Sequence, residues 1–210
     1  NTYSVSNNSL LIDNGGVVYS TAGTIAAGTN CVNNSVTVRG ANSLWTLGNS
    51  DLTVGFAAST GNYLTVSQGG VVTNISTLTV NAYNSLNTAG GGTVFVNVLS
   101  LQPNAQMGVD VVSPGKVVVQ SGGLTTLYGT INPGDLPRSG RRTCTVLTCA
   151  GTLAGTLSLG PLPPGYTGSI STNSAVSPKL VELLVIGPSS STVLFQGGFG
   201  CSVRGRRRES

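Results

Sequence analysis

The sequence contains no histidine and very little charge. Lysine, arginine, aspartate and glutamate make up only 8% of the 210 residues, against roughly 25% in an ordinary soluble protein. Without histidine the chain lacks the commonest general base and the commonest metal ligand. The six acids are scattered, which disfavours the paired carboxylates of sugar-cleaving enzymes: Asp13, Asp51, Asp110, Asp135, Glu182 and Glu209. We therefore expect no catalytic residue, no metal site and no cofactor, and predict that the protein is not an enzyme.

The few basic residues are also unevenly placed. Three lie at one junction, Arg138, Arg141 and Arg142, and four lie in the last seven positions: Arg204, Arg206, Arg207 and Arg208. The rest of the chain is nearly uncharged, which argues against a nucleic-acid groove along its length. No apolar run approaches the eighteen or so residues of a membrane span, so no membrane span is predicted. We interpret the start of the sequence as a mature N-terminus left by cleavage of a secretion signal.

Glycine and small polar or β-branched residues replace the missing charge. The chain has 30 glycines and many serines, threonines, asparagines and valines. Valine and threonine suit a pleated, half-buried strand, whereas the strong helix formers are scarce. The composition therefore predicts an all-β protein whose corners are supplied by glycine and asparagine.

Internal repeats define the organisation of the sequence. Ser9–Val18 matches Tyr63–Val72 position for position, and Lys116–Thr125 is a third copy. A second unit, Thr37–Thr46, aligns with Thr79–Thr88. Self-similarity of this kind is the signature of stacked supersecondary units.

The strand unit inside these repeats is Leu-Thr-Val or a close variant, and it recurs at residues 36–38, 52–54, 64–66 and 78–80. Strand alternation would send its two apolar residues inward and the threonine outward. Strands this short are stable when coils stack on one another and their apolar residues form a continuous stripe. We predict a right-handed parallel β-solenoid over residues 1–137, with about 20 residues per coil and six or seven coils. An antiparallel sandwich is the competing architecture, since it also uses short strands and frequent turns.

The texture changes after Asn132–Pro137, a turn-rich break. Residues 143–149, 152–159, 169–172 and 179–186 are predicted to be longer strands, and we expect residues 138–188 to form an antiparallel β cap over the open end of the coil. Ser189-Ser190-Ser191 predicts a flexible link, so residues 189–210 are assigned as a linker and a C-terminal assembly tail.

The four cysteines are candidate disulfide residues: Cys31, Cys144, Cys149 and Cys201. An even count in a chain of low charge fits an oxidising compartment. On one straight strand Cys144 and Cys149 would point to opposite faces and could not pair with each other. A bond from either one to Cys31 or Cys201, within the chain or between subunits, is the expected alternative, and the connectivity stays open.

Several blocks resemble the repeats of bacterial secreted β-strand-repeat proteins, the autotransporter-associated and PEP-CTERM-associated repeats. The resemblance covers roughly residues 5–187 and rests on Gly40–Trp45, Asp51–Gly55 and Leu64–Val72 within residues 36–74, on Cys144–Gly155 and on Leu162–Tyr166. It implies a β-strand-repeat fold and a secreted, extracellular or cell-surface location. It implies no activity.

The apolar, glycine-rich segment Thr192–Cys201 is the best functional clue in the sequence. We expect it to dock on a neighbouring subunit by strand addition, with copies of the same chain as the main partner. The candidate assembly residues are Val193, Leu194, Phe195 and Phe199, together with the four tail arginines. The predicted function is a self-assembling structural subunit of a surface fibre or surface layer. The alternative is a monomeric adhesin or passenger-type binding module that recognises carbohydrate or another surface, with Thr37, Thr53, Thr65 and Thr79 as a regular hydroxyl array.

Overall fold

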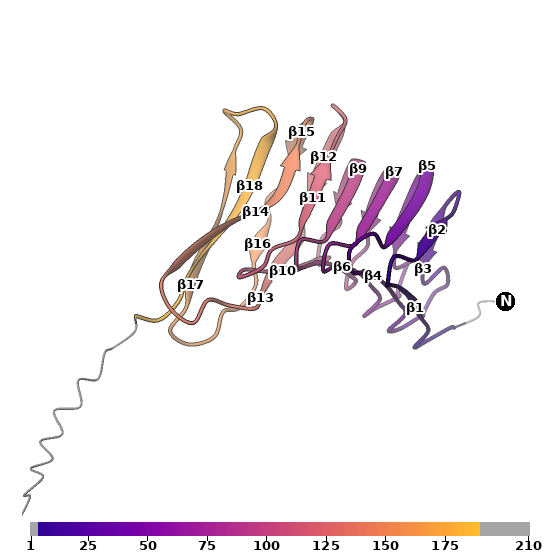
Figure 1. Ribbon diagram of the computed structural model, residues 1–210, viewed down its shortest axis with the longest axis horizontal. Helices are drawn as coiled ribbons and strands as arrows, with labels where there is room; N and C mark the ends of the chain where they lie inside the picture. The colour runs from indigo at the N-terminus through magenta and orange to yellow at the C-terminus, as the bar shows by residue number, and fades with distance from the viewer. Residues whose placement is uncertain (1–3, 190–210) are drawn as a thin grey trace, which may run out of the picture.

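The computed structural model describes residues 4–189, and these form a rod of stacked coils (Figure 1). The described residues contain no helix and hence none that could cross a membrane. Eighteen strands follow one another along the chain: β1 (Ser9–Ile12), β2 (Val17–Tyr19), β3 (Gly23–Ile25), β4 (Ser35–Arg39), β5 (Leu44–Val54), β6 (Tyr63–Ser67), β7 (Val71–Val80), β8 (Ser85–Thr88), β9 (Thr93–Leu101), β10 (Gln106–Asp110), β11 (Lys116–Val119), β12 (Leu124–Leu127), β13 (Thr130–Gly134), β14 (Arg141–Cys149), β15 (Thr152–Ala154), β16 (Ser158–Leu159), β17 (Thr167–Asn173) and β18 (Lys179–Ile186).

Each coil has three sides, here called A, B and C. Side A is a seven-stranded parallel sheet in the order β1-β4-β6-β8-β10-β13-β16. Side B runs from β2 through the first halves of β5, β7 and β9 to β11 and β14, and side C runs from β3 through the second halves of the same long strands to β12 and β15. The long strands shift register between sides B and C, because each bends there around a corner. The predicted parallel β-solenoid is therefore confirmed, with about six coils.

Coil length varies more than the repeats suggest. On side A, the stretch of chain from Ser85 to its partner Gln106 is clearly shorter than the stretch from Thr130 to its partner Ser158. The coils are thus longer, and less uniform, than the sequence predicted. The extra residues lie at corners, so the strands stay in register and the interior stays continuous.

Alternation along the strands builds the core. On side A the inward positions are occupied by pairs such as Val36 and Val38 in β4 and Leu64 and Val66 in β6, all buried. Side C adds a column that includes Leu52, Leu78 and Leu99, each without exposed surface. Threonine takes the outward position between such residues, as the Leu-Thr-Val pattern predicts.

The decamer copies do not all lie on the same side. Ser9–Val18 and Tyr63–Val72 both run from side A to side B, two coils apart, but Lys116–Thr125 runs from side B to side C. The second repeated unit is offset in the same way, since Thr37–Thr46 turns from side A to B and Thr79–Thr88 turns from side C to A. The repeated element is therefore one strand, one corner and the next strand, and any corner of the coil can use it.

The coil continues well beyond residue 137. β14, β15 and β16 pair in parallel with the coil below, on β11, β12 and β13 respectively. The expectation of antiparallel strands is wrong for these three. It holds for β18, which pairs antiparallel with β14, and for β17, which pairs antiparallel with β18. This β17–β18 hairpin extends side B past the last coil, at the end opposite the N-terminus (Figure 1).

Candidate functional site

The charged residues of the described chain are dispersed. Arg39 forms an ion pair with Asp13 on the neighbouring coil, with 3.1 Å between Nη2 and Oδ2. Asp51 accepts a hydrogen bond from the backbone N–H of Thr77 at 3.0 Å. Among residues 4–189 no three His, Cys, Asp or Glu side chains lie close enough together to hold a metal ion.

Two acids do approach each other at the end of side A. Burial, and after it the negative charge of Asp135, raise the pKa of Asp110 above its ordinary value. Asp110 is the last residue of β10, and Asp135 directly follows β13, the next strand of the same sheet. The pair comes from a corner where two coils stack.

The described cysteines lie at opposite ends of the rod. Cys31 is buried in the loop before β4, and the backbone N–H of Val5 donates to its sulfur at 3.4 Å. Cys144 and Cys149 are buried thiols in β14, and burial raises the pKa of Cys144. Four coil spacings, about 19 Å, separate Cys31 from β14, so the fold excludes a bond within the chain between Cys31 and either of them.

The prediction that Cys144 and Cys149 face opposite ways is wrong. A register shift between Thr145 and Leu147 marks a β-bulge, and this extra residue turns both sulfurs inward. Their partners on β18, Leu183 and Lys179, are four residues apart, which corresponds to about 13 Å along a strand. A disulfide between the two remains excluded, now by distance. The structure contains no disulfide among residues 4–189, and Cys201 lies outside the described residues.

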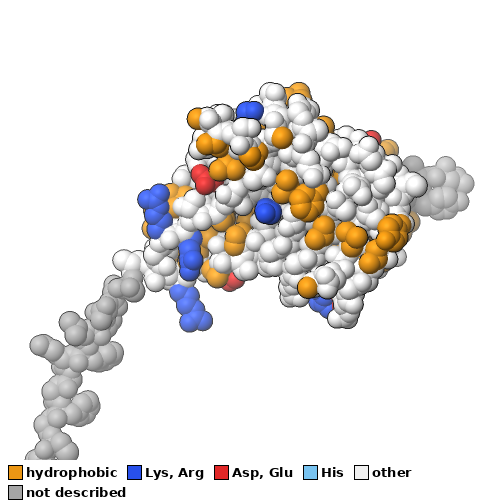
Figure 2. Space-filling model, turned by 45° about the horizontal axis from the view of Figure 1, so that its top comes forward, with side chains coloured by type: hydrophobic (Ala, Val, Ile, Leu, Met, Phe, Trp, Pro, Cys, Tyr) orange, Lys and Arg blue, Asp and Glu red, His pale blue; other side chains and the backbone are white. Residues whose placement is uncertain are grey.

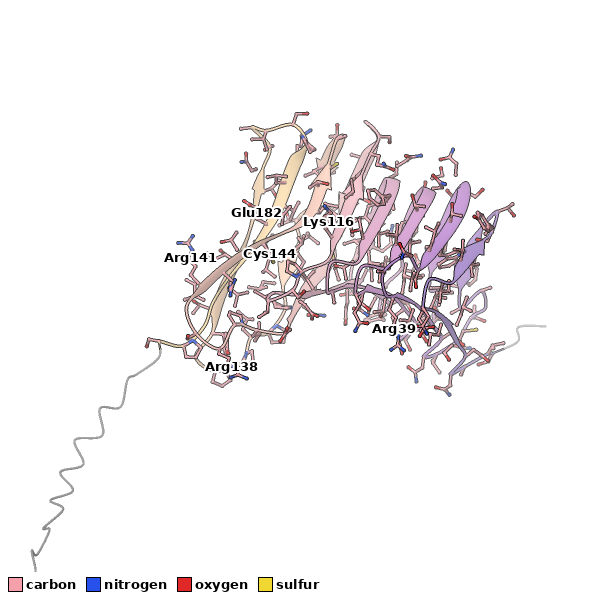
Figure 3. The ribbon with its side chains drawn as sticks, viewed as in Figure 1. Arg39, Lys116, Arg138, Arg141, Cys144 and Glu182 are labelled. Atoms are coloured by element: carbon pink, nitrogen blue, oxygen red, sulfur yellow. The ribbon has the colours of Figure 1, made fainter. Side chains whose placement is uncertain are left out.

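The basic junction lies at the C-terminal end of the rod. Arg138, Arg141 and Arg142 are exposed there, and Figure 3 shows Arg138 and Arg141 pointing outward near the last coils. The candidate assembly residues of the tail lie outside the described residues: Val193, Leu194, Phe195, Phe199, Arg204, Arg206, Arg207 and Arg208.

The predicted hydroxyl array divides between two sides of the coil. Thr37 stacks on Thr65 on side A, while Thr53 stacks on Thr79 on side C. The side C pair belongs to a longer column that runs, coil by coil, through Thr24, Thr53, Thr79, Ser100 and Thr126. The threonines are thus regular outward positions of two sheets and do not form one flat array of four.

A ladder of asparagines, which the sequence analysis did not identify, stacks at the corner between sides C and A. Asn8, Asn34, Asn62 and Asn84 each directly precede a strand of side A. The amide Nδ2 of each one donates to the Oδ1 of the next, at 2.9, 3.0 and 2.8 Å along the ladder. The ladder stops at the next coil, where Ala105 occupies this position.

The ladder also satisfies the backbone of this corner. The Nδ2 of Asn62 donates to the carbonyl oxygens of Cys31 and Thr60, and its Oδ1 accepts the backbone N–H of Asn34 at 2.8 Å. Buried amides bonded in this way hold neighbouring coils in one register. The four asparagines are separated by 26, 28 and 22 residues in the sequence. Because these spacings are unequal, the asparagines do not form a repeat of fixed period.

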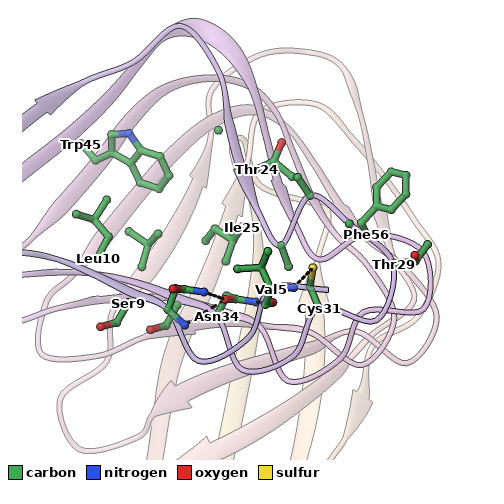
Figure 4. Close-up of a pocket in the computed structure, with 17 residues that line it drawn as sticks. Val5, Ser9, Leu10, Thr24, Ile25, Thr29, Cys31, Asn34, Trp45 and Phe56 are labelled. Atoms are coloured by element: carbon green, nitrogen blue, oxygen red, sulfur yellow. Dashed lines mark hydrogen bonds between the residues drawn. The ribbon is translucent and has the colours of Figure 1, made fainter. Parts of the chain in front are cut away.

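The N-terminal end of the rod is hollow. A depression of about 870 Å³ opens on the first coil and is lined largely by apolar side chains, among them Val5, Leu10, Ile25, Val36, Trp45 and Phe56. Figure 4 shows Leu10, Ile25 and Trp45 around the same space. Ile25, Val36 and Trp45 form a buried floor, while Val5, Leu10 and Phe56 form an exposed rim. We call this depression the N-terminal hollow.

Gly23 lies in the wall of the hollow, where its neighbours leave no room for a side chain. It occupies the inward position on side C that Leu52 and Leu78 fill in the next coils, and an added Cβ would lie 2.7 Å from Leu52. Trp45 reaches into this space and donates its indole N–H to Ser20 at 3.0 Å. Trp45 is thus a buried packing residue that also lines the depression.

The sheet edges around the hollow are unpaired on their outer side. β1, β2 and β3 are the first strands of their sheets, and within residues 4–189 no strand pairs with them from the N-terminal side. The surface of the rod is otherwise poor in charge, and Figure 2 shows a group of Lys and Arg side chains toward the end where the described chain stops. The N-terminal end therefore combines open hydrogen-bonding edges with an apolar depression and is the best candidate site on the molecule.

The fold defines the protein as a β-solenoid with one open and one partly covered end. Comparison with known proteins gives no further identification: no family model matches the chain, and no curated protein or solved structure shows a significant match to it.

Proposed function

We propose that the protein is a non-enzymatic, extracellular structural subunit that joins copies of itself head to tail into a surface fibre or layer. The observation that carries this proposal is the difference between the two ends of the rod. The N-terminal end presents three unpaired strands around an apolar hollow, and the C-terminal end carries the β17–β18 hairpin and an exposed basic junction.

Unlike ends favour a heterologous contact. A two-fold dimer needs one patch that is complementary to itself, whereas a contact between two different patches repeats from copy to copy. The sheets of a solenoid run along its axis, so a copy added at one end leaves the same free end exposed on the new copy. Such a contact does not close on itself and produces a filament.

The dispersed chemistry of the body supports a structural role. The acids of residues 4–189 lie on several coils, and Asp110 and Asp135 come from the stacked corners of two neighbouring coils. The weakly charged coils are consistent with the secreted location that the sequence resemblance implies. The cysteines do not add to this argument, because Cys144 and Cys149 are thiols.

The test is assembly of the full 210-residue chain. Sedimentation velocity over a range of protein concentrations, together with negative-stain images, should show filaments whose axial repeat matches one rod. A closed dimer or ring of fixed size would contradict head-to-tail joining. A monomer at every concentration would contradict self-assembly altogether.

The outward hydroxyl column on side C favours a second candidate, a monomeric module that binds surface carbohydrate. Thr53, Thr79 and Ser100 stand at the spacing of neighbouring strands, about 4.8 Å, on one sheet face. Saturable binding of the monomer to a polysaccharide, lost when Thr79 is replaced by valine, would support this function over the first.

A further inference from the structure

We propose that the N-terminal hollow is the receptor for the tail of a neighbouring copy, with Val193 and Phe195 as the inserted side chains. This inference rests on the proposed function, because it supplies the contact by which one subunit would hold the next. The strand Thr192–Gln196 would add to the free edge of β1 and complete the first coil.

The first argument is the match between the hollow and the segment. Each of the first three side A strands directs two apolar residues inward at alternate positions: Leu10 and Ile12, Val36 and Val38, Leu64 and Val66. Val193 and Phe195 have the same spacing, with Leu194 between them. A strand of this pattern laid beside β1 would stack both side chains on the inward pair Leu10 and Ile12, and Leu10 lines the hollow.

The second argument is the length of chain available. The described chain stops at Ser189, beyond β18, and six strand spacings separate β18 from β2 on side B, about 29 Å. Phe195 is six residues past Ser189, and a fully extended chain of six residues spans at most about 21 Å. Val193 and Phe195 therefore lie too close to Ser189 along the chain to reach the hollow of their own rod, and only the hollow of another copy is open to them.

The third argument is the chemistry of the edge. Open parallel edges next to an exposed apolar surface are a template for an added strand. Main-chain hydrogen bonds to β1 would supply affinity, and the hollow would supply specificity for large apolar side chains at alternate positions. The Thr192–Gln196 segment carries no charge that would have to be buried.

The decisive experiment mixes two variants of the full chain. Leu10→Asp places a carboxylate on the rim of the hollow and leaves the tail intact, whereas Val193→Asp/Phe195→Asp alters the tail and leaves the hollow intact. Each variant alone should lose polymerisation at concentrations where the natural sequence assembles. Their 1:1 mixture should give a complex of two chains and nothing larger, because only one productive tail–hollow pair remains. Sedimentation velocity measures all three samples.

Leu11→Asp is the matched control for the hollow. Leu11 is the next residue of β1, is similarly exposed at 52% against 44% for Leu10, and points outward. This variant should polymerise as the natural sequence does. Equal loss of assembly in Leu10→Asp and Leu11→Asp would overturn the assignment of the hollow.

Trp45 provides a direct readout of occupancy, since it is the only tryptophan of the chain and lines the hollow. A synthetic peptide with the sequence of residues 190–200, added to the non-polymerising Val193→Asp/Phe195→Asp variant, should change the tryptophan fluorescence saturably. Adding Leu10→Asp to that variant should weaken peptide binding by about 30-fold or more, because the docked strand would bury a carboxylate.

The outcomes separate this inference from the proposed function. A chain of natural sequence that never polymerises contradicts the proposed function. Polymers that form equally well with Val193→Asp/Phe195→Asp leave that function standing and overturn the tail docking. A peptide that leaves Trp45 fluorescence unchanged also overturns it, because the hollow would then receive something other than the tail.

Discussion

The two ends of the rod treat the same physical problem differently. Every solenoid coil buries its inward side chains against the coils before and after it, so the first and last coils each have one face without a partner. At the C-terminal end β18 packs on β14 and places Val181, Leu183 and Val185 in the core. At the N-terminal end Leu10 and Phe56 are left on the rim of an open depression.

The interiors of the two halves of the rod differ in the opposite sense, because the half with the open end has more side-chain hydrogen bonds at the corner between sides C and A. The first four coils are joined by the asparagine ladder, which ends at Asn84, while the following coils carry Ala105 and Gly129 at that position. The N-terminal half thus carries the asparagine ladder and is open at its end, whereas the C-terminal half lacks the ladder and is covered at its end on side B by β18. At the C-terminal end the hairpin covers the last coil on side B. The N-terminal end is open and its coils are held in register, so it can accept a further strand.

The same substitution at the two ends should have very different costs. Leu183→Asp places a carboxylate at a fully buried position of β18 and should lower the free energy of unfolding by about 4 kcal/mol or more. Leu10→Asp leaves the charge in contact with water and should cost about 1 kcal/mol or less. Urea unfolding followed by circular dichroism measures both values, and equal costs would remove the distinction between the ends.

A second test compares an interior member of the asparagine ladder with the exposed member at its end. Asn62→Ala removes a buried amide and leaves the backbone N–H of Asn34 without its acceptor, so we expect a loss of about 3 kcal/mol in stability. Asn8→Ala removes the exposed first member and should cost about 1 kcal/mol or less. Thermal unfolding of the two variants gives the comparison. If each asparagine had only a local role, the two variants would lose similar amounts of stability.

The solenoid could be predicted from the sequence because the patterns that indicate it lie within short stretches of the chain. The alternation of Leu64, Thr65 and Val66 indicates which side chains face inward, and the glycines and asparagines after the strands indicate where the chain turns. The interior positions of Leu52, Leu64 and Leu78 followed directly from that pattern.

The features that could not be predicted depend on the number of residues in each coil, on a bulge and on the stacking of coils. No short sequence pattern indicates these properties. Because the coils differ in length, Lys116–Thr125 falls on another side than the first two copies. β14, β15 and β16 pair in parallel because the chain makes a further coil after residue 137. The bulge between Thr145 and Leu147 reversed the direction of one cysteine. The N-terminal hollow lies on a coil with no predecessor among the described residues, which is a property of the stack and not of any short stretch of sequence.

A third test examines the interior of the C-terminal half. The hydroxyl of Thr125 is buried without a hydrogen-bond partner in the described structure, between Leu99 and Leu153 in the inward column of side C. Thr125→Val keeps the shape and removes the unsatisfied hydroxyl, so it should stabilise the protein by about 1 kcal/mol. Thr126→Val is the control, because that hydroxyl faces outward and bonds to Ser100 at 3.0 Å. A gain in the control as large as that of Thr125→Val would contradict the explanation. The midpoint of urea unfolding reports the change.

The smallest expected effect concerns Asp110, at the same end of the molecule. Its pKa in the folded protein is raised by burial and then by Asp135, so its ionised form is less favourable there than in the unfolded chain. Its contribution to stability is therefore fully present below the ordinary pKa of 3.8 and is lost as the pH rises through the higher folded value.

Asp110→Asn should thus stabilise the protein at neutral pH by less than about 1 kcal/mol, since the group is largely exposed, and should flatten this part of the stability profile. Asp51→Asn provides the contrast, because Asp51 accepts the backbone N–H of Thr77 and its loss should not stabilise. Unfolding midpoints at pH 4 and pH 7 would decide the point, and a profile unchanged by Asp110→Asn would show that the two acids do not interact across the corner.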